Sequence, residues 1–441
     1  MNPKSLFLLV FVTILGVTSS EVSFKNVTLW TWEKNINTID SANNLGTYLP
    51  KKWTSTIIVI GTIPILHENS VTNVENVKEL QFLKNQIVEI RPGAFKNLNS
   101  VKTLKINGSN ITTIAGVFDN LTLEQLNLNN NQISVIPKGV VKNPNLKGLS
   151  FAGNLIETIE ESAFDHLPNL ETLDLFQNLL SDLPLGIFKH LPHLTIVSLS
   201  NNKFTTIKEE IFDSSSIRYL YLDGNLLKTV PENFMGRMPN LQGIYLNRNH
   251  LKTIPAGIFN NKTLLHIELA NNEISHIAPD AFNNMPNLAN LILSSNKLAQ
   301  YNNNWLRNCP NIYRLFLSNN LIEQLPVQAF KNIYNQKEQW VKLNSNKIKK
   351  ITAENFKGWK LVDTLDLSQN EIEQWHEDYL ADAEFIRALN LAYNKITCLD
   401  GDLDKIFKAK KATYLSGNPL SEECKSKIRE WSARNQDKVS L

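Results

Sequence analysis

Cysteine is scarce in this chain of 441 residues, which has only three: Cys309, Cys398 and Cys424. Three cysteines cannot supply the dense disulfide framework of small secreted scaffolds, so a hydrophobic core must hold the fold together. A strong charge imbalance is also missing, because 45 Lys and Arg residues are set against 42 Asp and Glu residues. The formal net charge of +3 argues against nucleic acid as a partner, since nucleic-acid binding requires clustered basic charge.

Long apolar runs are missing beyond the first twenty residues. Leu6–Val17 is the one continuous apolar stretch, with Lys4 before it and Thr18, Ser19 and Ser20 after it. This layout is typical of a secretory signal peptide, and the run is shorter than the roughly 20 residues of a transmembrane helix. We therefore expect a signal peptide at 1–20 and a secreted, extracellular chain without a membrane span.

Catalytic and metal-binding motifs are not found in the sequence. It contains no HExxH, GxSxG or GxxxxGK segment and no cysteine cluster with zinc-ligand spacing. Its eight His residues share no position that would build a metal site. We therefore expect a protein that is not an enzyme and that uses no cofactor or metal.

One internal repeat covers most of the chain. The segment Leu170–Leu180 has apolar residues at its first, fourth, sixth and eleventh positions and Asn178 at its ninth. The same frame begins fifteen times, in steps of 22 to 26 residues, at Val77, Val101, Leu123, Leu146, Leu170, Leu194, Ile217, Leu241, Leu264, Leu288, Ile312, Glu338, Val362, Ile386 and Lys410. The ninth position is Asn in fourteen of these frames and Ser109 in the other. A repeat of this period indicates a solenoid of stacked coils.

The alternation within each frame predicts a short strand at positions three to five, with the fourth and sixth side chains turned inward. The ninth-position Asn lies where the chain leaves the strand, and its amide can satisfy backbone groups that are buried at the turn. Phe recurs seventeen or eighteen residues after ten of the starts, at Phe95, Phe118, Phe164, Phe188, Phe212, Phe234, Phe259, Phe282, Phe330 and Phe356. We expect these rings to form a packed spine inside the convex side.

This frame resembles the typical leucine-rich repeat of about 24 residues, LxxLxLxxNxIxxIPxxxFxxLxxL. It is similar to the extracellular subclass found in Toll-type receptor ectodomains and in secreted insect leucine-rich immune proteins. The resemblance covers Val77 to Leu420 and implies an α/β solenoid, a curved horseshoe with a parallel concave sheet of about fifteen short strands and a mostly irregular convex side. We expect an N-terminal cap at 21–76, the solenoid at 77–418, and a C-terminal cap with a short polar tail at 419–441.

The cysteines fit this resemblance in different ways. Asn418, Pro419 and Leu420 followed by Cys424 resemble the start of the family's cysteine-rich C-terminal cap, and Cys398 lies one coil earlier. The resemblance implies a Cys398–Cys424 disulfide, with two separate thiols as the alternative. Cys309 occupies a slot that is apolar in other repeats, which favours a small buried residue over an intermolecular link.

The outward positions three and five divide the concave face into two halves. The first six frames place small and polar residues there, whereas later frames place large ones. The expected ligand-binding strip comprises Arg218, Tyr219, Tyr221, Tyr245, Arg248, Arg314, Phe316 and Trp340. Exposed aromatic and Arg side chains are enriched at protein interfaces, and the arginines suggest a ligand with carboxylates or sulfates. The alternative is that the rings only stack on neighbouring strands and stabilise the sheet.

Asparagine-linked glycosylation is expected at five sequons, which begin at Asn26, Asn107, Asn110, Asn120 and Asn261. Three of them lie between residues 107 and 120, so glycans would shield the N-terminal half of the sheet. Two functions agree with these patterns. The first is a secreted protein that recognises a protein or pathogen-associated ligand, such as a microbial surface, in innate immunity. The second is an extracellular adhesion or signalling module that binds a protein ligand. The oligomeric state is left open.

Overall fold

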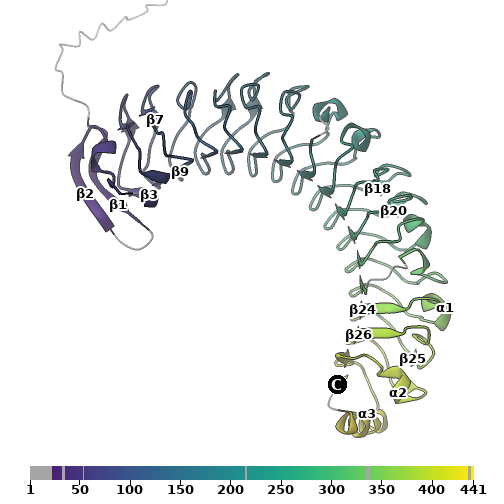
Figure 1. Cartoon of the computed structure of the whole chain (residues 1–441). Coiled ribbons are helices and arrows are strands. Elements are labelled where there is room, and N and C mark those ends of the chain that lie inside the picture. The colour runs from purple at the N-terminus through teal and green to yellow at the C-terminus, as the bar shows by residue number, and fades with distance from the viewer. Residues whose placement is uncertain (1–21, 32–34, 53, 214–215, 334–337, 436–438) are drawn as a thin grey trace, which may run out of the picture.

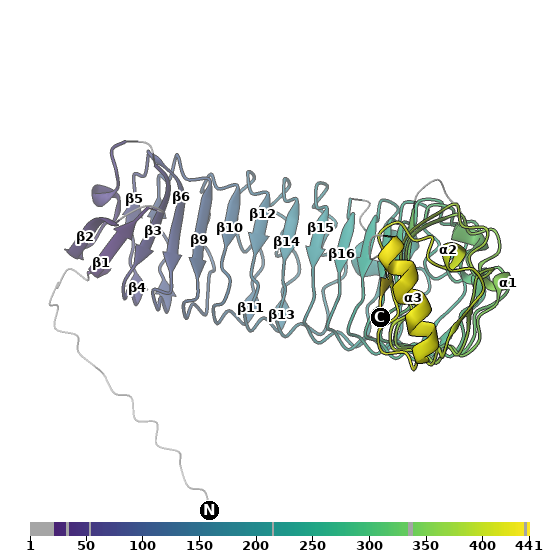
Figure 2. The same cartoon turned by 90° about the horizontal axis from the view of Figure 1, so that it is seen from below.

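A computed structural model describes residues 22–31, 35–52, 54–213, 216–333, 338–435 and 439–441. The expected signal peptide lies outside these described residues. The chain forms an open arc in which strands line the inner side and turns with short helices form the outer side (Figure 1). Seen from below, the strands of the N-terminal half lie next to one another along the arc, and a helix lies at the C-terminal end (Figure 2).

Nineteen strands form one sheet on the concave side. Each of the fifteen frames contributes one strand, which pairs in parallel with the strand of the next frame. These strands are β6 (Val77–Leu83), β9 (Thr103–Asn107), β10 (Gln125–Asn127), β12 (Gly148–Ser150), β14 (Thr172–Asp174), β15 (Ile196–Ser198), β16 (Tyr219–Tyr221), β17 (Gly243–Tyr245), β19 (His266–Glu268), β21 (Asn290–Ile292), β22 (Arg314–Phe316), β23 (Gln339–Lys342), β24 (Leu361–Asp366), β26 (Phe385–Asn390) and β28 (Ala412–Tyr414). The predicted curved solenoid is therefore confirmed.

The remaining four strands of the sheet lie at its two ends. β3 (Thr54–Ile60) pairs in parallel with β6 and adds one coil before the first frame. β1 (Phe24–Trp30) runs antiparallel to both β3 and β2 (Asn35–Ala42), so a short antiparallel unit covers the N-terminal end of the core. At the other end β29 (Val439–Ser440) pairs in parallel with β28. The sequence led us to expect a polar tail there, but Val439 packs against the core and extends the sheet.

The ninth-position Asn residues form a hydrogen-bonded ladder along the solenoid. Asn178 shows the pattern: its Nδ2 donates to the carbonyls of Phe151 and Leu175 at 3.0 and 3.1 Å, and its Oδ1 accepts from the Ile156 N–H at 3.0 Å. The ladder connects each coil to the one before it. It breaks at Ser109, which is buried and whose hydroxyl has no hydrogen-bond partner among the described residues.

The convex side is held by the predicted Phe spine. All ten of these Phe side chains are buried, and neighbouring rings such as Phe188 and Phe212 have centroids 5.6 Å apart. Trp305 takes the place of the Phe that is missing between Phe282 and Phe330, and its ring N–H donates to the Ile277 carbonyl at 3.1 Å. This side otherwise contains small parallel pairs: β4 (Ile65–Leu66) with β7 (Glu89–Ile90), β5 (Val71–Thr72) with β8 (Phe95–Lys96), β11 (Val135–Ile136) with β13 (Thr158–Ile159), β18 (Thr253–Ile254) with β20 (His276–Ile277), and β25 (Trp375–His376) with β27 (Leu399–Asp400).

Helices are few and short. α1 (Ala353–Phe356) and α2 (Leu403–Ile406) are single turns on the convex side, where 3-10 turns also occur at Gly46–Tyr48, Glu209–Phe212, Phe234–Arg237, Asn303–Leu306 and Lys331–Ile333. α3 (Glu422–Arg434) begins at Ser421, whose hydroxyl accepts from the Cys424 N–H at 3.1 Å. It buries Ile428 and Trp431 against the end of the solenoid and thereby covers the core.

The cysteines have separate structural roles. Cys398 and Cys424 form a disulfide with Cα atoms 5.5 Å apart, which ties α3 to the preceding coil. Cys309 is a free, fully buried thiol whose Sγ–H donates to the Phe282 carbonyl at 2.8 Å. Burial raises the pKa of the Cys309 thiol to about 11, so this residue packs as a small core side chain.

Candidate functional site

The aromatic strip runs along the concave face from Tyr219 on β16 to Trp340 on β23. Two rows of side chains follow from the strand register. One row contains Tyr219, Gly243, His266, Asn290, Arg314 and Trp340, and the other contains Tyr221, Tyr245, Glu268, Ile292, Phe316 and Lys342. Both rows lie on the concave side because their positions alternate with the buried fourth and sixth positions of each frame, although Asn290 is itself covered by its neighbours.

Three tyrosines form the N-terminal part of the strip. The rings of Tyr221 and Tyr245 are stacked, with centroids 4.4 Å apart and an interplanar angle of 12°. Tyr219 extends across Gly243, because a Cβ at Gly243 would lie 2.9 Å from the Tyr219 ring. The Tyr219 hydroxyl also lies 3.1 Å from Gln242 Oε1. Stacking on neighbours therefore occurs, and yet all three rings stay half-exposed and available to a ligand.

A second cluster of rings and cations forms the C-terminal part. The Arg314 guanidinium lies 5.2 Å from the Trp340 ring centroid and 5.3 Å from that of Tyr313. The Lys342 ammonium lies 4.8 Å from the Phe316 ring centroid. Cation–π contacts of this length contribute about 0.5–1 kcal/mol each where the pair is exposed. These contacts also restrict the side-chain conformations of Arg314 and Lys342. Trp340 is 36% exposed on the surface that they form.

Polar groups join the two clusters. His266 Nδ1 lies 2.6 Å from Asn290 Nδ2, and partial burial lowers the pKa of the His266 imidazole. Burial also raises the pKa of the Tyr245 hydroxyl, and the negative charge of the nearby Glu268 raises it further. His266 and Tyr245 are therefore neutral near pH 7, so the fixed charges of this surface come from carboxylates, Arg and Lys.

A hollow of about 580 Å³ opens at the C-terminal ends of β15 to β21. Its floor and walls include Tyr221, Asp223, Asn247, Arg248 and Glu268. The Asp223 carboxylate accepts from the Asn247 N–H at 2.9 Å, and Glu268 Oε2 accepts from Asn247 Nδ2 at 2.8 Å. Sequence reasoning passed over Asp223 and Asn247, which share position seven of adjacent frames, a position that could have been read as the rim of the strip.

The three arginines of the expected ligand-binding strip lie apart. Arg218 precedes β16 and is exposed at one end of that strand, whereas Arg248 follows β17 and lines the hollow at the opposite edge of the sheet. Six residues separate these frame positions, which corresponds to about 20 Å along a strand. Arg314 lies between its aromatic neighbours in mid-sheet. The structure thus groups Arg248 with the tyrosines and Arg314 with Phe316 and Trp340, and leaves Arg218 outside both clusters.

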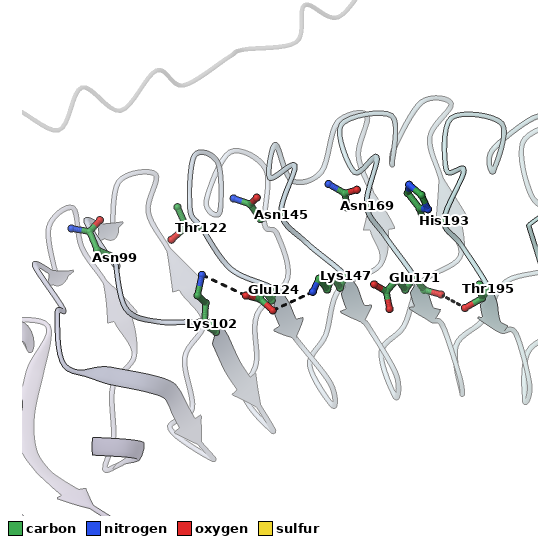
Figure 3. A pocket seen from close by; sticks show the side chains of 10 residues that line it. All are labelled: Asn99, Lys102, Thr122, Glu124, Asn145, Lys147, Asn169, Glu171, His193 and Thr195. Carbon is green, nitrogen blue, oxygen red and sulfur yellow. Dashed lines mark hydrogen bonds and ion pairs between the residues drawn. The ribbon is translucent and has the colours of Figure 1, made fainter. Parts of the chain in front are cut away.

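A second groove, which sequence reasoning missed, lies on the flank of the polar half. Its cavity of about 760 Å³ crosses five coils and is lined by Asn99, Lys102, Thr122, Glu124, Asn145, Lys147, Asn169, Glu171, His193 and Thr195. Figure 3 shows one row of these side chains at the start of the strands and a second row on the adjoining loops. Glu124 pairs with Lys102 at 3.5 Å and with Lys147 at 3.6 Å. The alternating charges at frame position two were visible in the sequence, and their mutual pairing makes the groove nearly neutral.

The comparison with known families settles what this architecture is. The family model described as leucine rich repeat matches residues 75–133, 122–180, 170–227, 239–298 and 339–401, which together are more than half of the chain. This chain belongs to the leucine-rich repeat family.

Relatives of this leucine-rich repeat protein agree with that assignment. It is 32% identical over 117 residues to the human leucine-rich repeats and immunoglobulin-like domains protein 3, an alignment that covers 21% of this chain and 10% of that protein. This leucine-rich repeat protein thus spans about a tenth of the length of that curated relative.

Solved structures show the same fold at low identity. A leucine-rich repeat protein of Leptospira interrogans superposes with a TM-score of 0.66 at 23% identity, over 83% of this chain and 90% of that one. TLR13 in complex with single-stranded RNA superposes with a TM-score of 0.60 at 18% identity, over 85% of this chain and 67% of that one. Toll in the Toll–Spätzle complex of Drosophila superposes with a TM-score of 0.53 at 19% identity, over 83% of this chain and 64% of that one. At these identities the likeness concerns the fold.

The sequons of this leucine-rich repeat protein differ in accessibility. Asn26, Asn110 and Asn120 are exposed, and Asn107 is half-buried at the end of β9. Asn261 is only 7% exposed, and its Nδ2 donates to the Met238 carbonyl at 2.9 Å. A glycan at this nitrogen would have to disturb that bond and the packed convex side, so Asn261 is the least accessible of the five sequons and its glycosylation stays a prediction.

The described part of this leucine-rich repeat protein offers neither a membrane-spanning helix nor a cluster of metal ligands. Its helices are all too short or too polar to cross a membrane. No three His, Cys, Asp or Glu side chains of the described residues are arranged to hold a metal ion.

Proposed function

We propose that this leucine-rich repeat protein is secreted and recognises a protein ligand, of the host or of a microbial surface, through the aromatic strip in innate immunity. The observation that carries the proposal is the division of one sheet into two halves. From β16 to β23 half-exposed rings and ring-packed cations line the concave face, whereas β6 to β15 present mostly polar side chains and no aromatic ring at the corresponding positions. Aromatic and Arg side chains of this kind dominate interface energetics.

Fold relatives support an extracellular recognition role. Toll is described with its ligand Spätzle as a molecular hub in Drosophila development and innate immunity. Because that description names both processes, a developmental signalling or adhesion role is the second candidate. Expression distinguishes the two: induction after microbial challenge supports immunity, and restriction to a developing tissue supports signalling or adhesion.

The binding test compares matched variants of the full secreted chain as bait in extracellular fluid. Tyr245→Ala and Trp340→Ala should each weaken capture of the same protein by about 2 kcal/mol, or about thirtyfold, if they are central interface residues. Gln125→Ala on β10 is the control, because Gln125 is exposed on the polar half of the same face. Capture that survives both aromatic substitutions but fails with Gln125→Ala would contradict the proposal. An RNA captured in place of a protein, as in the TLR13 complex, would also contradict it.

A further inference from the structure

The hollow beside the stacked tyrosines holds two carboxylates that accept hydrogen bonds from the same residue, Asn247. Asn247 donates its backbone N–H to Asp223 and its side-chain amide to Glu268. A third contact, 3.3 Å long, joins the Ser200 hydroxyl to the second oxygen of Asp223. No ion pair within the described residues involves Asp223 or Glu268. The carboxylates are therefore held in place by neutral donors, and no cation of the described residues forms an ion pair with them.

This arrangement costs free energy in the unbound protein. Burial raises the pKa of the Asp223 carboxyl, and the like charge of Glu268 adds to that effect. Glu268 belongs to β19, which pairs with β17, where Tyr245 lies directly beside it. The hollow thus combines two negative charges with the stacked rings of Tyr221 and Tyr245. Carboxylates attract cations, and the faces of aromatic rings do so as well.

We propose that the hollow receives a cationic side chain, the guanidinium of an arginine, from the protein ligand. The inference rests on the proposed function and names the chemistry of its partner. A planar guanidinium can donate to both carboxylates while its face lies against the tyrosine rings, which an ammonium cannot do. The hollow of about 580 Å³ has room for such a side chain. Arg248 at the rim faces solvent and forms no ion pair with the two carboxylates in the described structure.

This assignment reverses the expectation drawn from the arginines of the sequence. Arg314 and Lys342 pack on rings two and three strands beyond Glu268, so they do not neutralise the hollow. The carboxylates of Asp223 and Glu268 thus lie near β16 to β19, with Arg248 at the rim of their hollow, and the ring-packed cations Arg314 and Lys342 lie near β22 and β23. A ligand would present its arginine to the two carboxylates.

The test uses two fluorescent peptides that differ only in one residue, arginine or citrulline. Citrulline keeps the shape of arginine and lacks its charge, so the difference isolates the cation. We expect the full secreted chain to bind the arginine peptide about tenfold more tightly in an anisotropy titration, a difference typical of one charge-assisted contact. Because the chain has a net charge of +3, overall attraction cannot produce this preference. Equal binding of the two peptides would overturn the proposal.

Variants locate the effect. Asp223→Asn and Glu268→Gln should each remove most of the preference for arginine, whereas Glu171→Gln in the flank groove should leave it unchanged. Melting temperatures of the three variants show whether each is folded. If Glu268→Gln and Asp223→Asn retain the preference, the hollow is not the site. Loss of protein capture in Tyr245→Ala with the preference retained in Glu268→Gln would refute this inference alone. Capture that is retained in Tyr245→Ala, together with a preference that is lost in Glu268→Gln, would refute the proposed function alone.

Discussion

Replacing Asn249 by Ala removes one rung from the middle of the asparagine ladder. Its Nδ2 donates to the carbonyls of Leu222 and Leu246 at 3.0 and 3.1 Å, and its Oδ1 accepts from the Leu227 N–H at 3.0 Å. The two carbonyls keep a second donor each, because Asn225 also donates to Leu222 and Asn272 also donates to Leu246. The Leu227 N–H, in contrast, loses its ladder partner.

The magnitude follows from this inventory. A buried N–H left without a partner costs about 1–3 kcal/mol, and each lost shared bond adds about 0.5–1 kcal/mol. We therefore expect Asn249→Ala to destabilise the protein by about 2–5 kcal/mol. Because a coil contacts only its neighbours, the effect should be concentrated in the coils around Leu227 and Asn249.

The assay is chemical denaturation combined with hydrogen exchange read by mass spectrometry. Peptides that contain Leu227 should exchange faster in the variant than in the parent protein, and peptides near both caps should not. Asn260→Ala is the control, because Asn260 is exposed and its side chain forms no hydrogen bond to another residue of the described ranges. Equal losses of stability in the two variants would refute the ladder as the source of cohesion between coils.

Three further outcomes test other parts of the structure. Ser109→Asn should raise stability by about 1 kcal/mol in denaturant titrations, because an amide there can complete the ladder; a loss of stability would mean that this coil has a different geometry. Cys309 should resist iodoacetamide at about pH 8 until the protein unfolds, since its thiol pKa is raised to about 11; prompt labelling would place it outside the core. Asp223→Asn should raise the melting temperature at about pH 7 and lose that advantage toward about pH 4. The reason is that burial raises the pKa of the Asp223 carboxyl in the folded protein above its ordinary 3.8, so the parent protein loses stability as the pH rises through the folded pKa and this carboxyl ionises. A difference in melting temperature between variant and parent that stays constant with pH would exclude this cause.

The repeat made most of the fold predictable. The frame specified fifteen strands, their inward side chains, the Asn ladder and the Phe spine, because each depends on local periodicity that recurs in every coil. The ends were less predictable. β29 follows a polar segment, and its pairing with β28 depends on a neighbouring strand that is distant in sequence. α3 likewise is stabilised by the exposed end of the core as much as by its own residues.

The sequence predicted which side chains of the candidate site point to the concave face, but it predicted less well which charged residues lie together there. Alternation placed the rings of Tyr245 and Trp340 on the concave face, since side-chain direction follows from the frame. Charge grouping required the structure, because Asp223 and Glu268 come from different coils and share the donor Asn247. The burial of Asn261 was equally hidden, since its sequon is indistinguishable in sequence from the exposed one at Asn120.

The most direct test of the aromatic strip as the binding surface places a glycan on it. Ile292→Asn creates the sequon Asn-Leu-Ser in the strip, with Leu293 and Ser294. The double variant Glu79→Asn/Gln81→Thr creates one on β6, nine strands away, or about 43 Å at the spacing of neighbouring strands. Ile292→Asn combined with Ser294→Ala carries the same Asn without a glycan.

Affinity for the captured protein is then measured by calorimetry on each glycosylated and folded variant. We predict that the glycan at position 292 abolishes binding, while the variant with a glycan at position 79 and the unglycosylated variant bind within about twofold of the parent, as substitutions outside central contacts do. Binding that persists with the glycan at position 292 and disappears with the glycan at position 79 would contradict this prediction.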